Sequence, residues 1–268
     1  MTASPQTITM LGTGNALVTH CFNTCFVLQS CGGSRLLVDT GGGNGILTQL
    51  ERAHIDRGSL SHLFITHAHT DHILGAIWLI RITLQRPNPP QLHIYSHRRV
   101  LRLLQLFTEE LLPKKLTDKM ADRILLHELT DGDTFNVGDI RLQCFDIHST
   151  KEKQFGFKAW LPDGQCLVCL GDEPYNEANH SYAVGADWLM SEAFCLYADR
   201  DRFKPYEKHH STALDAARLA QQLGARNLIL YHTEDQTLTT RKQKYTEEAQ
   251  HVYQGPVFVP DDLEVIHL

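Results

Sequence analysis

One six-residue segment, His67–His72, constrains this chain more than any other feature. Its sequence, His-Ala-His-Thr-Asp-His, brings three imidazoles and one carboxylate together, one residue after the apolar run Leu63–Ile65. Neutral imidazole and carboxylate are preferred ligands of zinc and of neighbouring divalent metals. The first two histidines can face one ion, and the aspartate and the last histidine can face another. The pattern therefore predicts a metal site at the end of a buried strand.

Composition narrows the class of protein. The chain has 268 residues, of which 42% are hydrophobic and 21% charged, as is ordinary for a soluble globular protein. It contains no run of the roughly 20 apolar residues that a membrane span requires, and no secretory signal is evident. Its formal charge of −6 argues against a protein built chiefly to bind a nucleic-acid backbone. We therefore expect a cytoplasmic protein without membrane association, in a single domain spanning residues 1–268.

Short apolar runs alternate with segments of helical period, which predicts an α/β fold. The clearest helical segments are 72–84, 98–107 and 211–223, and residues 98–121 are predicted to form a helical insertion or cover. Ligand-type side chains lie just past the ends of five apolar strands: His67, His148, Asp172, Glu192 and His232. Because strands of layered α/β folds hold functional residues at their ends, we expect these side chains to converge on one site.

The order and spacing of these residues resemble the metallo-β-lactamase superfamily. The resemblance implies a four-layer αβ/βα sandwich of two mixed sheets with outer helices. It also implies a site for two divalent metal ions at one edge of the two sheets. Zinc is the expected metal, with manganese and iron as open alternatives. The resemblance also implies the ligand sets: His67, His69 and His148 for one ion, Asp71, His72 and His232 for the second, and Asp172 as the bridge.

Within this superfamily the chain resembles the tRNA 3′-processing endonucleases (tRNase Z) and related phosphodiesterases. The matching segments are Leu11–Gly14, Ser191–Phe194, His210–Ala213 and Asn227–His232. The resemblance implies a metal-dependent phosphodiesterase that uses a hydroxide shared by the two ions. It further implies that His210, oriented by Glu192, assists the leaving oxygen, and that Asp71 serves catalysis as well as metal binding.

Two departures from the tRNase Z pattern bear on the substrate. In that family a long arm that grips tRNA precedes the aspartate, whereas here residues 155–170 predict only a hairpin. After its last histidine the family shows serine and then arginine and tyrosine, whereas this chain has Thr233–Gln236. We therefore expect a small phosphodiester as the substrate, with nucleic acid less favoured and tRNA 3′ processing as an alternative.

Other interpretations stay open at this point. Tyr175 resembles the tyrosine with which lactonases of the superfamily polarise a carbonyl, so a lactonase or thioesterase is the alternative enzyme. A redox or non-enzymatic metal protein is a third class. Asp39 either orients a metal ligand or begins a glycine-rich turn, and Lys151 and Lys153 either meet a phosphate or are solvated. The apolar helical segment 98–121 either contacts a second copy in a homodimer or packs on its own domain.

Overall fold

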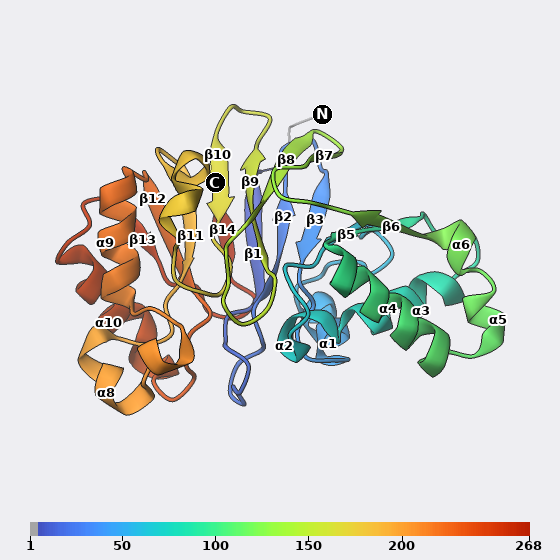
Figure 1. Ribbon diagram of the computed structural model, residues 1–268, viewed down its shortest axis with the longest axis horizontal. Coiled ribbons are helices and arrows are strands. Elements are labelled where there is room, and N and C mark those ends of the chain that lie inside the picture. The colour runs from blue at the N-terminus through green and yellow to red at the C-terminus, as the bar shows by residue number, and fades with distance from the viewer. Residues whose placement is uncertain (1–4) are drawn as a thin grey trace.

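The computed structural model describes residues 5–268 and contains two mixed sheets of seven strands each (Figure 1). The strands of the first sheet are β1 (Thr7–Gly12), β2 (Cys25–Gln29), β3 (Arg35–Val38), β4 (His62–Phe64), β5 (Leu92–Ser96), β6 (Ile124–Glu128) and β14 (Val265–His267). Their order in space is β14-β1-β2-β3-β4-β5-β6. The pairs from β3 to β6 are parallel and the others antiparallel.

The second sheet repeats this mixed arrangement in the other half of the chain. Its strands are β7 (Thr134–Val137), β8 (Ile140–Asp146), β9 (Phe155–Trp160), β10 (Cys166–Cys169), β11 (Trp188–Glu192), β12 (Asn227–Tyr231) and β13 (Val257–Phe258). Their order is β13-β12-β11-β10-β9-β8-β7. Strands β10 to β13 pair in parallel, so the carboxyl ends of β10, β11 and β12 meet at the same edge of the sheet.

Helices form the outer layers. They are α1 (Gly45–Arg52), α2 (Thr70–Ile73), α3 (Ala76–Gln85), α4 (Arg98–Leu111), α5 (Lys114–Thr117), α6 (Met120–Arg123), α7 (His180–Ala183), α8 (Arg200–Phe203), α9 (Ala213–Leu223) and α10 (Leu238–Gln250), with single 3₁₀ turns at η1 (Glu177–Asn179), η2 (Tyr197–Asp199) and η3 (Tyr206–Lys208). In Figure 1, α3 and α4 lie on one outer side of the molecule, and α9 and α10 lie on the other.

Burial on both faces of the strands produces this layering. Along β2, Phe26 points into the core between the sheets, whereas Val27 points into the core under the helices of the first half. Phe26 and Phe64 of the first sheet meet Phe157 of the second, with ring centroids 6.5 and 5.4 Å apart. Strands that read as continuous apolar runs are those covered on both faces. The predicted αβ/βα sandwich is therefore confirmed.

The segment 72–84, predicted as one helix, forms two helices, α2 and α3. The carbonyl oxygen of His72 accepts hydrogen bonds from the amide N–H (2.9 Å) and the hydroxyl (2.7 Å) of Thr40, which draws it away from helical pairing. Gly75 lies at the break, where a Cβ atom would come within 2.1 Å of the Thr40 carbonyl oxygen. The break ties α2, with its two candidate ligands, to the end of β3.

The other predicted helices form with adjusted boundaries. Helix α9 begins at Ala213, because Thr212 caps it in a reciprocal hydrogen-bonded box with Asp215. The segment 98–121 contains α4, α5 and the start of α6, and α4 buries Val100 and Leu104 in the same core as α3. Within residues 5–268 no helix is both long and apolar enough to cross a membrane. The single domain over residues 1–268 stays a prediction, and residues 1–4 lie outside the described part.

Candidate metal centre

Side chains from both sheets meet at one edge of the molecule, around a hollow of about 390 Å³. The segment His67–His72 follows β4 and enters α2, and Asp172 follows β10. Glu192 is the last residue of β11, and His232 follows β12. The strand ends thus bring together residues that lie up to 165 positions apart in the sequence, and four of the five side chains that we expected to converge are among them, His148 being the exception.

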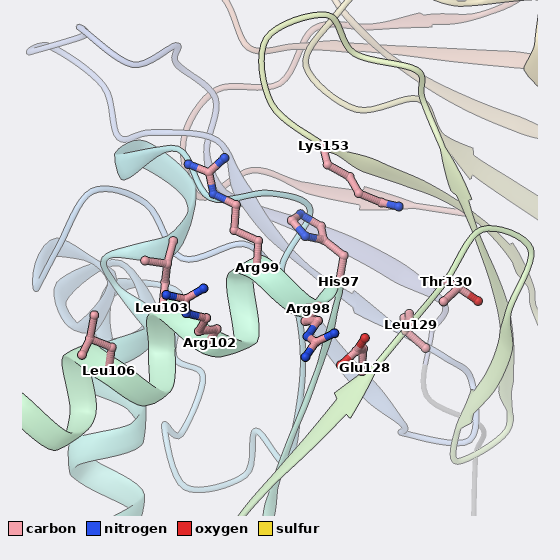
Figure 2. Close-up of a pocket in the computed structure, with 10 residues that line it drawn as sticks. All are labelled: His97, Arg98, Arg99, Arg102, Leu103, Leu106, Glu128, Leu129, Thr130 and Lys153. Atoms are coloured by element: carbon pink, nitrogen blue, oxygen red, sulfur yellow. The ribbon is translucent and has the colours of Figure 1, made fainter.

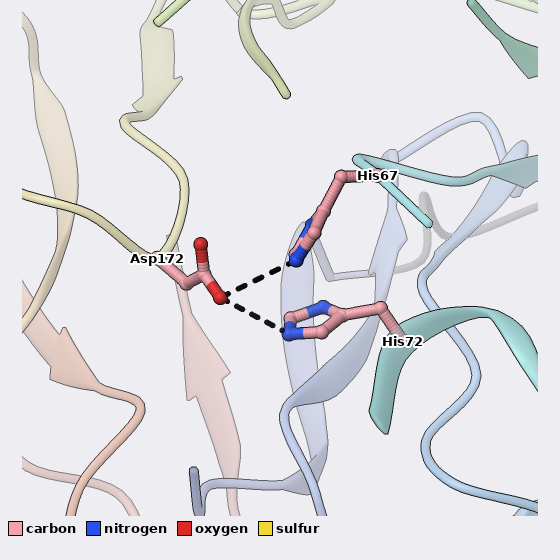
Figure 3. A group of neighbouring side chains, drawn as sticks. All are labelled: His67, His72 and Asp172. Carbon is pink, nitrogen blue, oxygen red and sulfur yellow. Dashed lines mark ion pairs between the residues drawn. The ribbon is translucent and has the colours of Figure 1, made fainter. Parts of the chain in front are cut away.

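Three of these side chains can share one ion. The Oδ2 atom of Asp172 lies 3.5 Å from Nε2 of His67 and 3.3 Å from Nε2 of His72 (Figure 3). All three residues are buried. Neutral imidazole nitrogens that face a carboxylate oxygen across such gaps form a donor set typical of zinc and similar divalent ions.

A second group adjoins the first. Nε2 of His72 lies 3.2 Å from Oδ2 of Asp71, and Nε2 of His232 lies 3.9 Å from the same oxygen. His232 also reaches Oδ2 of Asp172, at 3.5 Å. The Asp172 oxygen therefore lies between His67, His72 and His232, where a bridging ligand between two ions would be needed.

Unpartnered nitrogens test whether a cation fits here. Among residues 5–268, Nε2 of His72 and both ring nitrogens of His232 are buried and find no hydrogen-bond partner. Buried polar atoms are almost always paired, because leaving one unpaired costs about 1–3 kcal/mol. Divalent ions would occupy Nε2 of His72 and Nε2 of His232, so the residues present fit a metal.

The two other predicted ligands, His69 and His148, fall outside the metal-capable groups found among residues 5–268, and the role of each as a ligand stays a prediction. His69 lines the hollow, with its Nδ1 atom 2.7 Å from Nε2 of His67. His148 is exposed and is not part of any metal-capable group found among the described residues. Its backbone is left-handed, with φ of 59°, and its N–H donates to Asp146.

Charges at the centre shift the pKa values of its members. Burial lowers the pKa of His67 well below its usual value, which keeps the imidazole in the neutral form that binds metals. Burial also acts to lower the pKa of His72, but the carboxylates of Asp39 and Asp71 outweigh it and raise that pKa. Burial would raise the pKa of Asp71, yet the imidazole of His72 holds it well below the usual range.

Asp39 orients this half of the centre. Its Oδ2 atom accepts from Nδ1 of His72 at 2.7 Å and from the hydroxyl of Thr66 at 2.8 Å. Its Oδ1 atom accepts from the backbone N–H of Thr66 at 2.8 Å. A carboxylate that holds Nδ1 of a histidine leaves Nε2 free for a metal. Asp39 occupies the position of the predicted orienting group.

Glu192 and His210 form a pair beside the centre. Oε2 of Glu192 lies 3.6 Å from Nδ1 of His210, and within the described chain neither buried atom has a hydrogen-bond partner. The other oxygen of Glu192 accepts from the backbone N–H of Ser211. The imidazole of His210 stacks on Phe194 with a centroid distance of 4.9 Å and lies 5.2 Å from the ring of His232. His210 lines the hollow.

Sequence reasoning missed the loop that walls the hollow on another side. Residues Asn15–Val18 line it, and the side chain of Leu17 is 90% exposed. Oδ2 of Asp235 accepts from the backbone N–H groups of Thr19 and His20, which ties this loop to the segment after β12. The departure of Thr233–Gln236 from the tRNase Z pattern was the available signal.

Arg241 is a second feature that the sequence did not reveal. It is 1% exposed and donates to the hydroxyls of Thr233 (2.8 Å) and Thr13 (3.2 Å) and to the carbonyl of Pro260 (2.8 Å). These bonds hold Thr233, the residue after His232. The backbone of His232 itself is left-handed, with φ of 59°. A lone arginine in a helix carries no motif by which it could have been found.

Lys151 and Tyr175, two further candidate residues, lie in different pockets. Lys151 lines the hollow and lies 3.5 Å from Oε1 of Glu173. Tyr175 lines a different pocket, together with Ser191 and Ser211. It is not among the described residues that line the hollow, and its role stays a prediction.

Two mixed sheets with outer helices, and histidine and aspartate groups at their shared edge, define a metal-dependent hydrolase with the metallo-β-lactamase fold. A family model, that of the anti-Pycsar protein Apyc1, matches residues 6–258 and so covers most of the chain. The chain belongs to the family of the anti-Pycsar protein Apyc1.

Known proteins resemble the chain over nearly its whole length. The metallo-β-lactamase fold protein YhfI from Bacillus subtilis superposes with a TM-score of 0.77 at 20% identity, over 98% of this chain and 100% of that one. The short form of human tRNase Z gives 0.72 at 23% identity, over 97% and 98%. At these identities the likeness shows the fold. Ribonuclease Z of Myxococcus xanthus is 27% identical over 304 residues, which cover 95% of each chain.

Proposed function

We propose that this chain is a phosphodiesterase that hydrolyses small phosphodiesters with two divalent ions, zinc being the first choice. The residues that would hold the ions are His67, His69, His148 and Asp172 for one, and Asp71, His72, His232 and Asp172 for the other. When bound, such ions supply a nucleophile at neutral pH and neutralise charge on the phosphoryl oxygens. The unpartnered nitrogens of His72 and His232 support this assignment.

The Glu192–His210 pair is the observation that carries phosphodiester chemistry. Nδ1 of His210 faces the buried carboxylate at 3.6 Å, which leaves Nε2 for a group in the hollow. An imidazole held in this way can give a proton to a departing alkoxide oxygen. Hydrolysis of a carboxylic ester or a lactone with an activated leaving group has less need of this assistance.

The dimensions of the site favour a small substrate over tRNA. The hollow of about 390 Å³ lies in the range of small-molecule sites, and Lys151 and Lys208 at its wall can meet a phosphate. Strands β9 and β10 are joined only by residues 161–165. The alignment with Myxococcus xanthus ribonuclease Z is longer than this chain, 304 positions against 268 residues, so that relative carries segments that this chain lacks.

Hydrolysis of bis(p-nitrophenyl) phosphate by the zinc- or manganese-loaded protein tests the proposal. We expect turnover that depends on two metals per chain, counted by elemental analysis. The proposal fails if the fully loaded protein leaves this diester intact. Parallel assays separate the alternatives: faster cleavage of a precursor tRNA would favour the nuclease, and turnover of a lactone or thioester alone would favour the carbonyl hydrolase.

A further inference from the structure

A larger cavity lies apart from the metal centre. Its volume is about 600 Å³, and it shares no lining residue with the hollow at the centre. Figure 2 shows its lining side chains, which come from the first turns of α4, from the end of β6 and from the segment before β9. Among them are Arg98, Arg99, Arg102 and Lys153, with Glu128 as the one acid. A chain of net charge −6 thus carries a locally positive cavity.

Two of the arginines have their donors available. Arg99 pairs with Glu152, and Lys153 lies 3.5 Å from Asp146. Arg98 and Arg102, one helical turn apart, make no ion pair and no side-chain hydrogen bond to residues 5–268. Guanidinium groups four residues apart on a helix lie on the same face, so their donors can converge on one anion.

The position of these arginines is unfavourable for the helix itself. They occupy positions one, two and five of α4, where the unpaired backbone N–H groups already carry partial positive charge. Acidic residues stabilise such a terminus, and the first turn of this 14-residue helix has none. An anion in the cavity would reverse this repulsion and would also meet the backbone N–H groups of the first turn.

His97, the residue before α4, supplies an independent sign of a ligand. It lines the cavity, it is 3% exposed, and its Nε2 atom finds no hydrogen-bond partner in the described chain. Burial and the nearby charge of Lys153 lower its pKa to about 4, so the imidazole is neutral at pH 7. Its ring is fixed edge-on against Phe155, at a centroid distance of 5.5 Å.

We propose that this cavity is a second ligand site, which binds a phosphate-bearing small molecule of nucleotide size. The phosphate would lie against Arg98, Arg102 and the start of α4. The remainder would contact the apolar lining residues, Leu103 and Leu106 of α4 and Leu129 across the cavity (Figure 2). A volume of about 600 Å³ fits such a molecule, and the net charge of −6 favours it over the other source of phosphate esters, an RNA strand. The site does not depend on hydrolysis at the metal centre.

Calorimetric titration of ADP into the metal-loaded protein tests this site. We expect binding that weakens about tenfold or more in the variant Arg98→Gln/Arg102→Gln. The matched control is Arg218→Gln, which removes an exposed arginine from α9 and should leave ADP affinity unchanged. A second variant, Asp172→Ala, disrupts the metal centre and should retain the binding event. Thermal melting of each variant verifies that it folds.

Three results would overturn the proposal. Absence of ADP binding to the wild-type protein removes the ligand class. Loss of binding in Asp172→Ala but not in Arg98→Gln/Arg102→Gln assigns the nucleotide to the metal centre. Tighter binding of a single-stranded oligoribonucleotide than of ADP, lost in the same double variant, makes the cavity an RNA contact. If the double variant fails to fold, the single variant Arg98→Gln takes its place, because it replaces only one exposed arginine and should fold. Unchanged ADP affinity in this variant would then overturn the proposal.

Discussion

Left-handed backbone marks the residues around the candidate centre. Asp39, His148 and His232 have φ values of 56°, 59° and 59°. Residues other than glycine and asparagine adopt this backbone conformation at a cost in free energy. It persists only where the surrounding structure imposes it. Hydrogen bonds surround two of them: Asp39 accepts from Thr66, and Thr233, the residue after His232, accepts from Arg241. All three residues lie just past the end of a strand.

Replacement of His210 should slow hydrolysis and spare the metals. His210→Ala removes the proton donor beside Glu192 but none of the predicted ligands, so we expect kcat to fall about 100-fold or more. Steady-state assays with an alkyl phosphodiester, whose departing alkoxide needs a proton, and elemental analysis on the same sample measure both quantities. The neighbouring, exposed His209 gives a matched control, His209→Ala, which should behave as wild type. Equal kcat values for the two variants would contradict the role of His210.

Asp39 should act on metal affinity. Asp39→Asn keeps the size of the side chain, and asparagine tolerates the left-handed backbone, but the amide no longer accepts the His72 Nδ1–H with a charged oxygen. We expect the metal affinity to fall about 10- to 100-fold, measured by competition with a chromophoric chelator. Asp56→Asn, at an exposed position, is the control. Unchanged retention of both ions in Asp39→Asn would refute the orienting role.

At the scale of elements, a ladder of aromatic side chains crosses β4, β5 and β6. The rings of His62 and His93 stack at 4.9 Å, and Nδ1 of His93 lies 3.0 Å from Nε2 of His127. Burial, and then the neighbouring histidines, lower the pKa of His62 to about 4. The unfolded chain therefore takes up a proton near pH 6.5 that the folded chain resists until about pH 4.

The sign of this difference makes stability fall with acidity. The contribution of His62 to the free energy of unfolding is fully present above about pH 6.5. It decreases as the pH falls toward 4, because the unfolded chain binds the proton more readily than the folded chain. Since His62 is half-buried, solvent screening reduces its share to about 1 kcal/mol between pH 7 and 5. His62→Gln should therefore lose less thermal stability over that interval than wild type or His209→Gln. Parallel melting curves of the three proteins at both pH values decide it.

Periodicity and spacing predicted those elements whose stability is local or whose burial is uniform. The strands before Asp172 and His232, and the helix after Thr212, formed where apolar runs and helical period predicted them, within two residues for the helix. The break at Gly75 could not be predicted, because it depends on Thr40, a residue distant in sequence. Strand β6, short and half-buried at a sheet edge, also carries little pattern of its own.

The same distinction applies to the site. Ligand-type residues at strand ends could be identified one by one, and the structure brings His67, Asp71, His72, Asp172 and His232 together. Their buried supports could not, since Arg241 acts through backbone and hydroxyl groups that carry no motif. The exposed place of His148 was also beyond prediction, because it depends on the conformation of the loop between β8 and β9.

At the scale of the whole molecule, an apolar groove between α3 and α4 bears on the predicted homodimer. Trp78 and Leu111 line it and are 38% and 65% exposed. A second copy that covers this groove would remove both from water, so Leu111→Glu should shift a dimer toward monomer in sedimentation velocity. Val184→Glu, at an exposed apolar residue in the other half of the chain, is the control. A wild-type protein that sediments as a monomer contradicts the homodimer.

The candidate centre joins the two halves of the sandwich. His67, Asp71 and His72 follow β4 in the first half, whereas Asp172 follows β10 and His232 follows β12 in the second. Their carboxylates and imidazoles are buried, so metal ions would hold the two sheet edges together and bind the folded state alone. Ligands of that kind stabilise a protein by mass action, by about 2.7 kcal/mol at 100 times the dissociation constant.

Removal of the metals should therefore lower the melting temperature of the whole molecule. Calorimetric scans of the zinc-loaded protein with and without a chelator measure the change, and added zinc should reverse it. Asp172→Ala lacks the carboxylate that is predicted to bridge the two ions. In this variant the chelator should shift the melting temperature less. A melting temperature that the chelator leaves unchanged, in a wild-type sample shown by elemental analysis to have lost both ions, would mean that the sheet edges are held by the hydrogen bonds of Arg241 and Thr13 without metal.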